Sequence, residues 1–108
     1  MQDRVSQLFK AIADPTRRDI FHALVIASSA LSISQISNQF EISRQGITKH
    51  IKTLEDAGLI SIQSQGRERF CFAEPKPLQE VNKWLQFYAK YWDDSLDKLD
   101  TYLNSKNS

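Results

Sequence analysis

Five polar residues between positions 44 and 52 carry side chains suited to contacting nucleic acid: Arg44, Gln45, Thr48, Lys49 and Lys52. Arginine can bridge the two major-groove acceptors of guanine, glutamine can pair with adenine, and threonine can bond a base edge or touch a thymine methyl group. The two lysines suit phosphates. Their spacing would place all five on one face of a helix. The sequence therefore offers a helical face with the chemistry to bind DNA, although an ordinary solvated face would have the same composition.

Signals at both ends limit this helix. Ser43 is a good N-cap, because its hydroxyl can accept from the free amides of the first turn, and Gly58 supplies the left-handed residue that commonly ends a helix. Between them, Ile47, Ile51 and Leu54 recur at helical spacing and predict a buried stripe. One side of the helix is expected to pack, while the other remains accessible.

Composition bounds the class of protein. The 108 residues are enough for one domain, with 41% hydrophobic and 25% charged residues as in globular proteins. The sequence has no apolar run of about 18 residues and no secretory signal, so we expect a cytoplasmic protein with no membrane partner. Cys71 is the single cysteine and cannot form an intrachain disulfide. The net charge of +1 means that any DNA contact must come from local patterning.

Three helices are expected before residue 43. The first is short and amphipathic, and the second begins after Asp14, an N-cap followed by a favoured first-turn proline. The apolar side of the second helix is expected to hold Ile20, Phe21, Leu24 and Val25. Ser32 and Gln35 form a capping box that starts a third helix. A tight connection then leads to Ser43, which predicts a helix-turn-helix over residues 32–57.

The pattern changes to alternation after Gly58. Ile60 and Ile62 alternate with polar residues, Gln65 and Gly66 offer a turn, and alternation resumes to position 72. These features predict a β-hairpin over residues 59–73. The prolines at 75 and 77 end it and precede a long helix over residues 78–103. The predicted fold is thus mainly α with a small hairpin, as one winged helix-turn-helix domain over residues 1–108.

The segments DPTRRDIF, SRQGITKHIKTLEDAGLI and GRERFCF, in this order of elements, resemble the ArsR/SmtB family of winged-helix repressors. The resemblance implies a sequence-specific DNA-binding repressor, a dimer, a recognition helix in the major groove and a wing beside the backbone. Its DNA-facing positions fall on Ser43, Arg44, Gln45, Gly46, Thr48, Lys49, Gly66 and Arg67. Gly46 would also permit close backbone approach. At the wing, a solvated hairpin tip explains Arg67 and Arg69 equally well.

The last helix carries apolar residues on more than one stripe. One seam is expected to hold Leu85, Tyr88, Trp92, Leu96 and Leu99, whereas Trp84, Phe87 and Tyr91 point elsewhere. We expect one face to pack on its own domain and the other to meet a second copy, with residues 1–13 and 78–103 as dimerisation helices. The predicted homodimer would hold a near-palindromic operator. An aromatic pocket for an apolar effector is the competing interpretation.

No cofactor, metal site or catalytic group is predicted. The Cys-x-Cys pair of metal-sensing family members corresponds here to Ser32 and Ser34, and neutral hydroxyls cannot replace thiolates for soft metals. The last helix has no histidine, and no phosphate loop or catalytic arrangement of residues is present. Cys71 is expected to be a packing residue, with a redox role as the alternative. The alternative for the whole chain is a winged-helix protein-interaction module without a DNA target.

Overall fold

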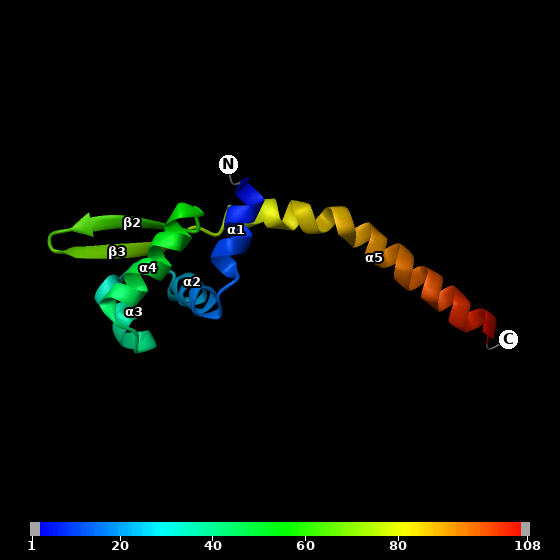
Figure 1. Ribbon diagram of the computed structural model, residues 1–108, viewed down its shortest axis with the longest axis horizontal. Coiled ribbons are helices and arrows are strands. Elements are labelled where there is room, and N and C mark those ends of the chain that lie inside the picture. Colours follow the sequence, from blue (N-terminus) through cyan, green and yellow to red (C-terminus); the bar gives the residue numbers. More distant parts are fainter. Residues whose placement is uncertain (1–2, 107–108) are drawn as a thin grey trace.

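The computed structural model describes residues 3–106. Its elements are α1 (Arg4–Ile12), α2 (Pro15–Ala27), β1 (Leu31–Ser32), α3 (Ile33–Phe40), α4 (Arg44–Asp56), β2 (Ile60–Gln65), β3 (Glu68–Ala73) and α5 (Leu78–Lys106), as Figure 1 shows. The predicted helices and hairpin are present with similar bounds. The molecule measures 71 × 31 × 22 Å, with the tip of β2 and β3 at one end of the long axis and the end of α5 at the other (Figure 1).

Local signals in the sequence start and stop the helices. Ser32 accepts from the Gln35 N–H at 3.1 Å while its own N–H donates to Gln35 Oε1 at 2.8 Å, which completes the predicted capping box. Ser43 accepts from the Gly46 N–H at 3.1 Å, and Gly58 adopts a φ of +78° after α4. These interactions supply partners for backbone groups that helix ends leave open.

Hydrogen bonds within the turn between α3 and α4 stabilise its conformation. Glu41 ends α3 with a φ of +53°, and its N–H donates to the Ser37 carbonyl. The Ser37 hydroxyl then donates to the Ile42 carbonyl at 2.6 Å. This short bonded connection fixes the direction of α4 relative to α3, as a helix-turn-helix requires.

The core lies where α1 to α4 meet the sheet. Its fully buried members include Leu8, Ile20, Ile36, Leu59 and the predicted stripe of α4. Val25 departs from the prediction, because it is 42% exposed and lies on the rim of α2. Helical spacing alone did not distinguish the centre of the buried stripe from its edge.

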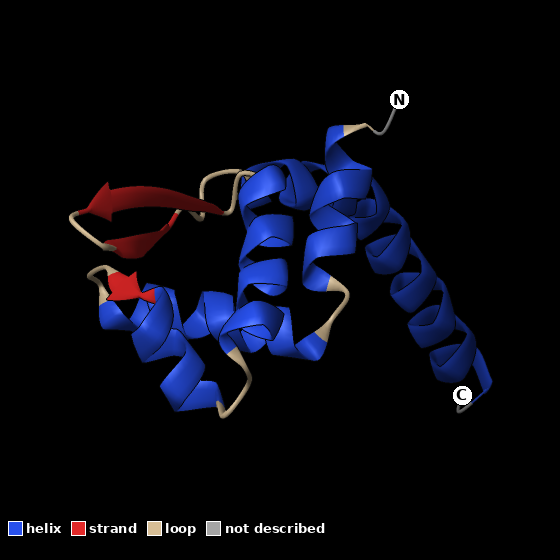
Figure 2. Cartoon of the chain, turned by 60° about the vertical axis from the view of Figure 1, so that its left-hand side comes forward, coloured by secondary structure: helices blue, strands red, loops and turns tan. Residues whose placement is uncertain are grey.

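The sheet has three strands, in the order β1-β3-β2 with antiparallel pairing. The predicted two-stranded wing was therefore incomplete, because Leu31 and Ser32 pair with Cys71 and Phe70 (Figure 2). Two residues are too short to show alternation, and only the fold brings them beside β3. The turn is also shifted by one residue, since Gln65 pairs with Glu68 and leaves Gly66 and Arg67 as the loop.

Helix α5 packs on its own domain only at its start. Leu78 and Val81 join the core, and Trp84 meets Phe9 of α1 edge to face with ring centroids 5.2 Å apart. From Leu85 onward, the large apolar residues identified on α5 are exposed. The expectation that one face of the helix packs along its own domain was wrong, because the helix runs away from the domain (Figure 1). No helix among residues 3–106 is long and apolar enough to cross a membrane.

Candidate nucleic-acid interface

The N-terminal half of α4 presents polar side chains that the protein itself does not use. Arg44, Gln45 and Lys49 are exposed, and within the described residues their side chains have no hydrogen-bonding or ionic partner. Opposite them, Ile47 and Ile51 are fully buried, so the helix is held by its apolar face. The exposed face can therefore meet a partner without breaking any contact that these three side chains make.

The hydroxyl groups on this face already form hydrogen bonds within α4 and its N-cap. Thr48 Oγ1 donates to the Arg44 carbonyl at 2.7 Å, and Ser43 Oγ accepts the N-cap bond from Gly46. Each hydroxyl has one hydrogen and two lone pairs. Thr48 thus has acceptors left for a partner, whereas Ser43 keeps its hydrogen.

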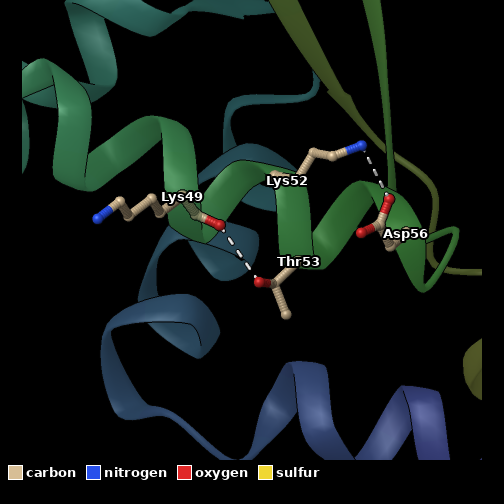
Figure 3. A network of polar contacts seen from close by, with 4 residues as sticks. All are labelled: Lys49, Lys52, Thr53 and Asp56. Carbon is tan, nitrogen blue, oxygen red and sulfur yellow. Dashed lines mark hydrogen bonds and ion pairs between the residues drawn. The ribbon is translucent and has the colours of Figure 1, made fainter.

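Among the predicted DNA-facing residues that the structure describes, Lys52 is the one whose side chain forms an ion pair within the protein. Its Nζ lies 3.3 Å from Asp56 Oδ1, with side chains 70% and 62% exposed (Figure 3). Sequence reasoning missed Asp56, although the spacing of four residues was a readable signal. The figure also shows the Lys49 side chain extending away from the helix, and no ion pair involves Lys49 among the described residues.

Packing inside the domain explains why position 46 is a glycine. A Cβ at this position would lie 2.8 Å from Ile42 Cγ2 and 3.3 Å from Ser43 Oγ, so any side chain would clash with the turn before α4. The structure thus gives this glycine a packing role within its own domain, at the turn before α4. A contact between Gly46 and DNA stays a prediction.

The wing places its charges on two sides. Gly66 adopts a φ of +62° with nothing near its missing Cβ, so glycine suits this position for its backbone conformation. Arg67 and Arg69 are exposed, whereas Glu68 is half-buried and points to the opposite face from Arg69, as neighbours on a strand do. Glu68 therefore does not share the face of Arg69.

Arg17 and Arg18 act within the fold. Arg17 donates to the carbonyls of Ala11 and Lys10, and Arg18 donates to those of Ile12 and Ala13, all at the end of α1. Helix ends leave such carbonyls without partners. The two arginines supply these partners, a role that their position in the sequence did not reveal.

Ser32, at one of the two positions related to metal ligands, and Cys71, the single cysteine, both have structural roles here. Ser32 is buried and caps α3, and Cys71 is fully buried in the core, where burial raises its pKa to about 11. A thiol with a raised pKa is a poor nucleophile and ligand at neutral pH. In the part of the chain that the structure describes, no three His, Cys, Asp or Glu side chains gather as a metal site.

An aromatic surface covers the first half of α5. Trp84 contacts Tyr88 with centroids 4.8 Å apart, and Phe87 meets both Tyr88 and Tyr91. The two stripes expected from the sequence are therefore joined by ring contacts. Tyr88, Tyr91, Trp92 and Ser95 line a shallow open groove of about 260 Å³.

Comparisons with known proteins agree on one family. A family model described as a helix-turn-helix domain matches residues 12–63. A Bacillus subtilis protein named uncharacterized HTH-type transcriptional regulator YuzN is 34% identical over 92 residues, which cover 80% of this chain and 100% of that protein. The transcriptional repressor SdpR from the same organism is 29% identical, covering 85% of this chain and 100% of the repressor.

Solved structures give the same result. An ArsR family transcriptional regulator superposes with a TM-score of 0.75 and 33% identity, covering 83% of this chain and 91% of that protein. An ArsR-like transcriptional regulator from a Rhodococcus species superposes with a TM-score of 0.76 and 27% identity, covering 94% and 92%. These relatives are named as transcriptional regulators, and they favour DNA binding over an interaction module without a DNA target.

Proposed function

Because the chain belongs to the ArsR family of winged helix-turn-helix transcriptional regulators, which bind DNA, we propose that it is a repressor that holds a near-palindromic operator as a homodimer. The supporting observation is the partner-free polar face at the start of α4, beside the bonded turn from α3. The related protein SdpR, named a transcriptional repressor, supports the direction of regulation. A regulator of this kind acts where the chromosome lies, which agrees with the expected cytoplasmic location.

We propose that α4 enters the major groove with Gln45 and Thr48 at base edges and Arg44 at a guanine or a phosphate. Lys49 and Lys52 would neutralise phosphates, and Ser43 and Gly46 would bring the start of the helix close to the backbone. Gly66 and Arg67 would touch the backbone from the wing. Helix N-termini favour phosphate through their free N–H groups, which suits the Ser43 end of α4.

We propose that the exposed face of α5, assisted by α1, joins two copies. The proposed contacts are those expected from the sequence: Leu85, Tyr88, Trp92, Leu96 and Leu99. These five side chains are between 42% and 69% exposed, and large apolar patches that are exposed on a protein surface usually mark an interface. Two-fold symmetry would set the two copies of α4 roughly 34 Å apart, about one turn of DNA.

Selection from random DNA followed by binding titrations tests the DNA proposal. If half a dozen phosphates are neutralised, affinity should fall roughly a thousandfold between about 50 and 200 mM salt. Lys49→Ala should weaken binding to all sequences alike, while Gln45→Ala should relax sequence preference. Lys98→Ala, on exposed α5, is the matched control and should bind as the wild type does. A flat salt response, or no enriched sequence, would overturn the proposal.

Mass measured by light scattering tests the dimer. Leu96→Glu should yield monomers at micromolar concentration, because it buries a charge in the proposed interface. Lys98→Glu changes charge on the same helix by two units at an exposed position outside the apolar seam and should stay dimeric. A wild-type protein that is monomeric under these conditions would rule out the proposed assembly.

A further inference from the structure

Thr48 has a single hydroxyl hydrogen, and the helix already uses it. The hydroxyl donates to the Arg44 carbonyl at 2.7 Å, four residues earlier on α4. This bond lies within one helix, so docking against another molecule need not disturb it. The groups that remain for a partner are the lone pairs of Oγ1 and the γ-methyl group.

Donating to DNA would require breaking the internal bond. A guanine N7 or O6 acceptor could be bonded only by giving up the Arg44 carbonyl, so one hydrogen bond would replace another with little net gain. An amino group on a base, in contrast, adds a bond to the one already present. The geometry therefore favours base donors and methyl groups over base acceptors.

On the basis of the proposed function, we propose that Thr48 selects an A·T pair by accepting from the N6 amino group of adenine while its methyl group contacts the thymine methyl. An A·T pair presents both groups in the major groove, whereas a G·C pair has no methyl and sets guanine O6 beside its only donor. Arg44 and Lys49 carry donors alone and suit guanine acceptors or phosphates. The start of α4 thus combines two side chains that can only donate, Arg44 and Lys49, with Thr48, whose hydroxyl has only acceptors left.

Thr53 provides a matched control on the same helix. Its hydroxyl donates to the Lys49 carbonyl at 3.2 Å, again four residues earlier (Figure 3). Thr53 is half-buried and lines a groove with Gln7 and Lys10 of α1, away from the exposed face that holds Thr48. Thr53→Val therefore removes an internal hydrogen bond of the same kind and leaves the proposed contact of Thr48 with DNA intact.

The experiment uses the full chain and a duplex taken from selection by the wild type. Each adenine is replaced in turn by purine, which lacks the N6 amino group, and each thymine by uracil, which lacks the methyl group. We expect one adenine at which loss of the amino group weakens DNA binding about three- to tenfold for the wild type and for Thr48→Ser. The same replacement should leave the affinity of Thr48→Val unchanged. Loss of the thymine methyl group from that same pair should weaken DNA binding by the wild type and by Thr48→Val but not by Thr48→Ser. Thr53→Val should behave as the wild type in both series.

The outcomes separate this inference from the function on which it rests. If 7-deazaguanine, which lacks the N7 acceptor, abolishes the effect of Thr48→Val, then Thr48 donates and the inference is overturned. The same holds if the wild type selects a sequence and Thr48→Val responds to every base replacement as the wild type does. If the wild type selects no sequence at all, the proposed function fails together with the inference.

Discussion

Arg17 of α2 donates from Nε to the carbonyl oxygen of Ala11 in α1 at 2.7 Å, and its Nη2 reaches the Lys10 carbonyl at 2.8 Å. One guanidinium thus closes the end of the preceding helix with two bonds. Arg17→Lys should lower the free energy of unfolding by about 1 to 2 kcal/mol, because an ammonium cannot reproduce the fixed fork of donors. Denaturant titration measures this loss. Arg44→Lys, at an exposed arginine whose side chain has no partner among the described residues, should change stability little, and equal losses in the two variants would contradict the assigned role.

Asp14 predicts an acid-dependent part of the stability. The N–H groups of Arg17 and Thr16 donate to Asp14 Oδ1 and lower the pKa of this carboxyl below its ordinary 3.8, more than partial desolvation raises it. The stabilisation from the charged form is therefore present above pH 3.8 and is lost as the pH falls through the lower folded-state pKa. Asp14→Asn keeps an N-cap acceptor without the charge. Its melting temperature should fall below that of the wild type near neutral pH and converge with it in acid, and a constant difference across this pH range would contradict the role assigned to the charge.

Asp56 is expected to moderate DNA binding by holding Lys52 along the helix. Asp56→Asn should tighten binding about two- to threefold, since exposed pairs of this kind contribute little each. The effect should disappear in a Lys52→Met background, because no ammonium is then left to release. Asp19→Asn removes the same charge from α2 and serves as the control. A gain of equal size in the Lys52→Met background would mean that net charge, and not the pair, is responsible.

Cys71 is expected to be inert in the folded protein. Burial raises the pKa of its thiol to about 11, against a smaller lowering by Arg69, so roughly one thiol in a thousand is ionised at about pH 8. Iodoacetamide should label the native protein far more slowly than the same protein in denaturant, as mass spectrometry would show. Rapid labelling of the native chain at one equivalent would instead support the redox alternative.

Much of the fold followed from local patterns. The caps at Ser32 and Ser43, the proline after Asp14 and the alternation from Ile60 were all readable, because helix ends and strands depend on neighbours within a few residues. The two-residue strand β1 was not, since only its pairing with β3 makes it a strand. Val25 was placed inside for a similar reason: spacing predicts a face, and the neighbouring elements decide how far that face is covered.

The candidate site divides in the same way. The residue types at Arg44, Gln45, Thr48 and Lys49 were visible in the sequence, and their exposure on one face of α4 followed from helical periodicity. The sequence did not show whether these side chains are available to bind DNA, because that depends on which donors and acceptors the protein already uses. The bond from Thr48 to the Arg44 carbonyl and the pair between Lys52 and Asp56 make two of the predicted contacts different from the rest.

The sequence by itself determined the order of elements, the family resemblance and the chemistry offered by α4, because these depend on local propensity and on residue type. The tertiary structure decided that Gly46 serves the turn before α4, that Arg17 and Arg18 close α1, and that α5 leaves its domain with its apolar face uncovered. Each of these depends on which atoms, distant or adjacent in sequence, come within hydrogen-bonding or van der Waals distance once the chain has packed.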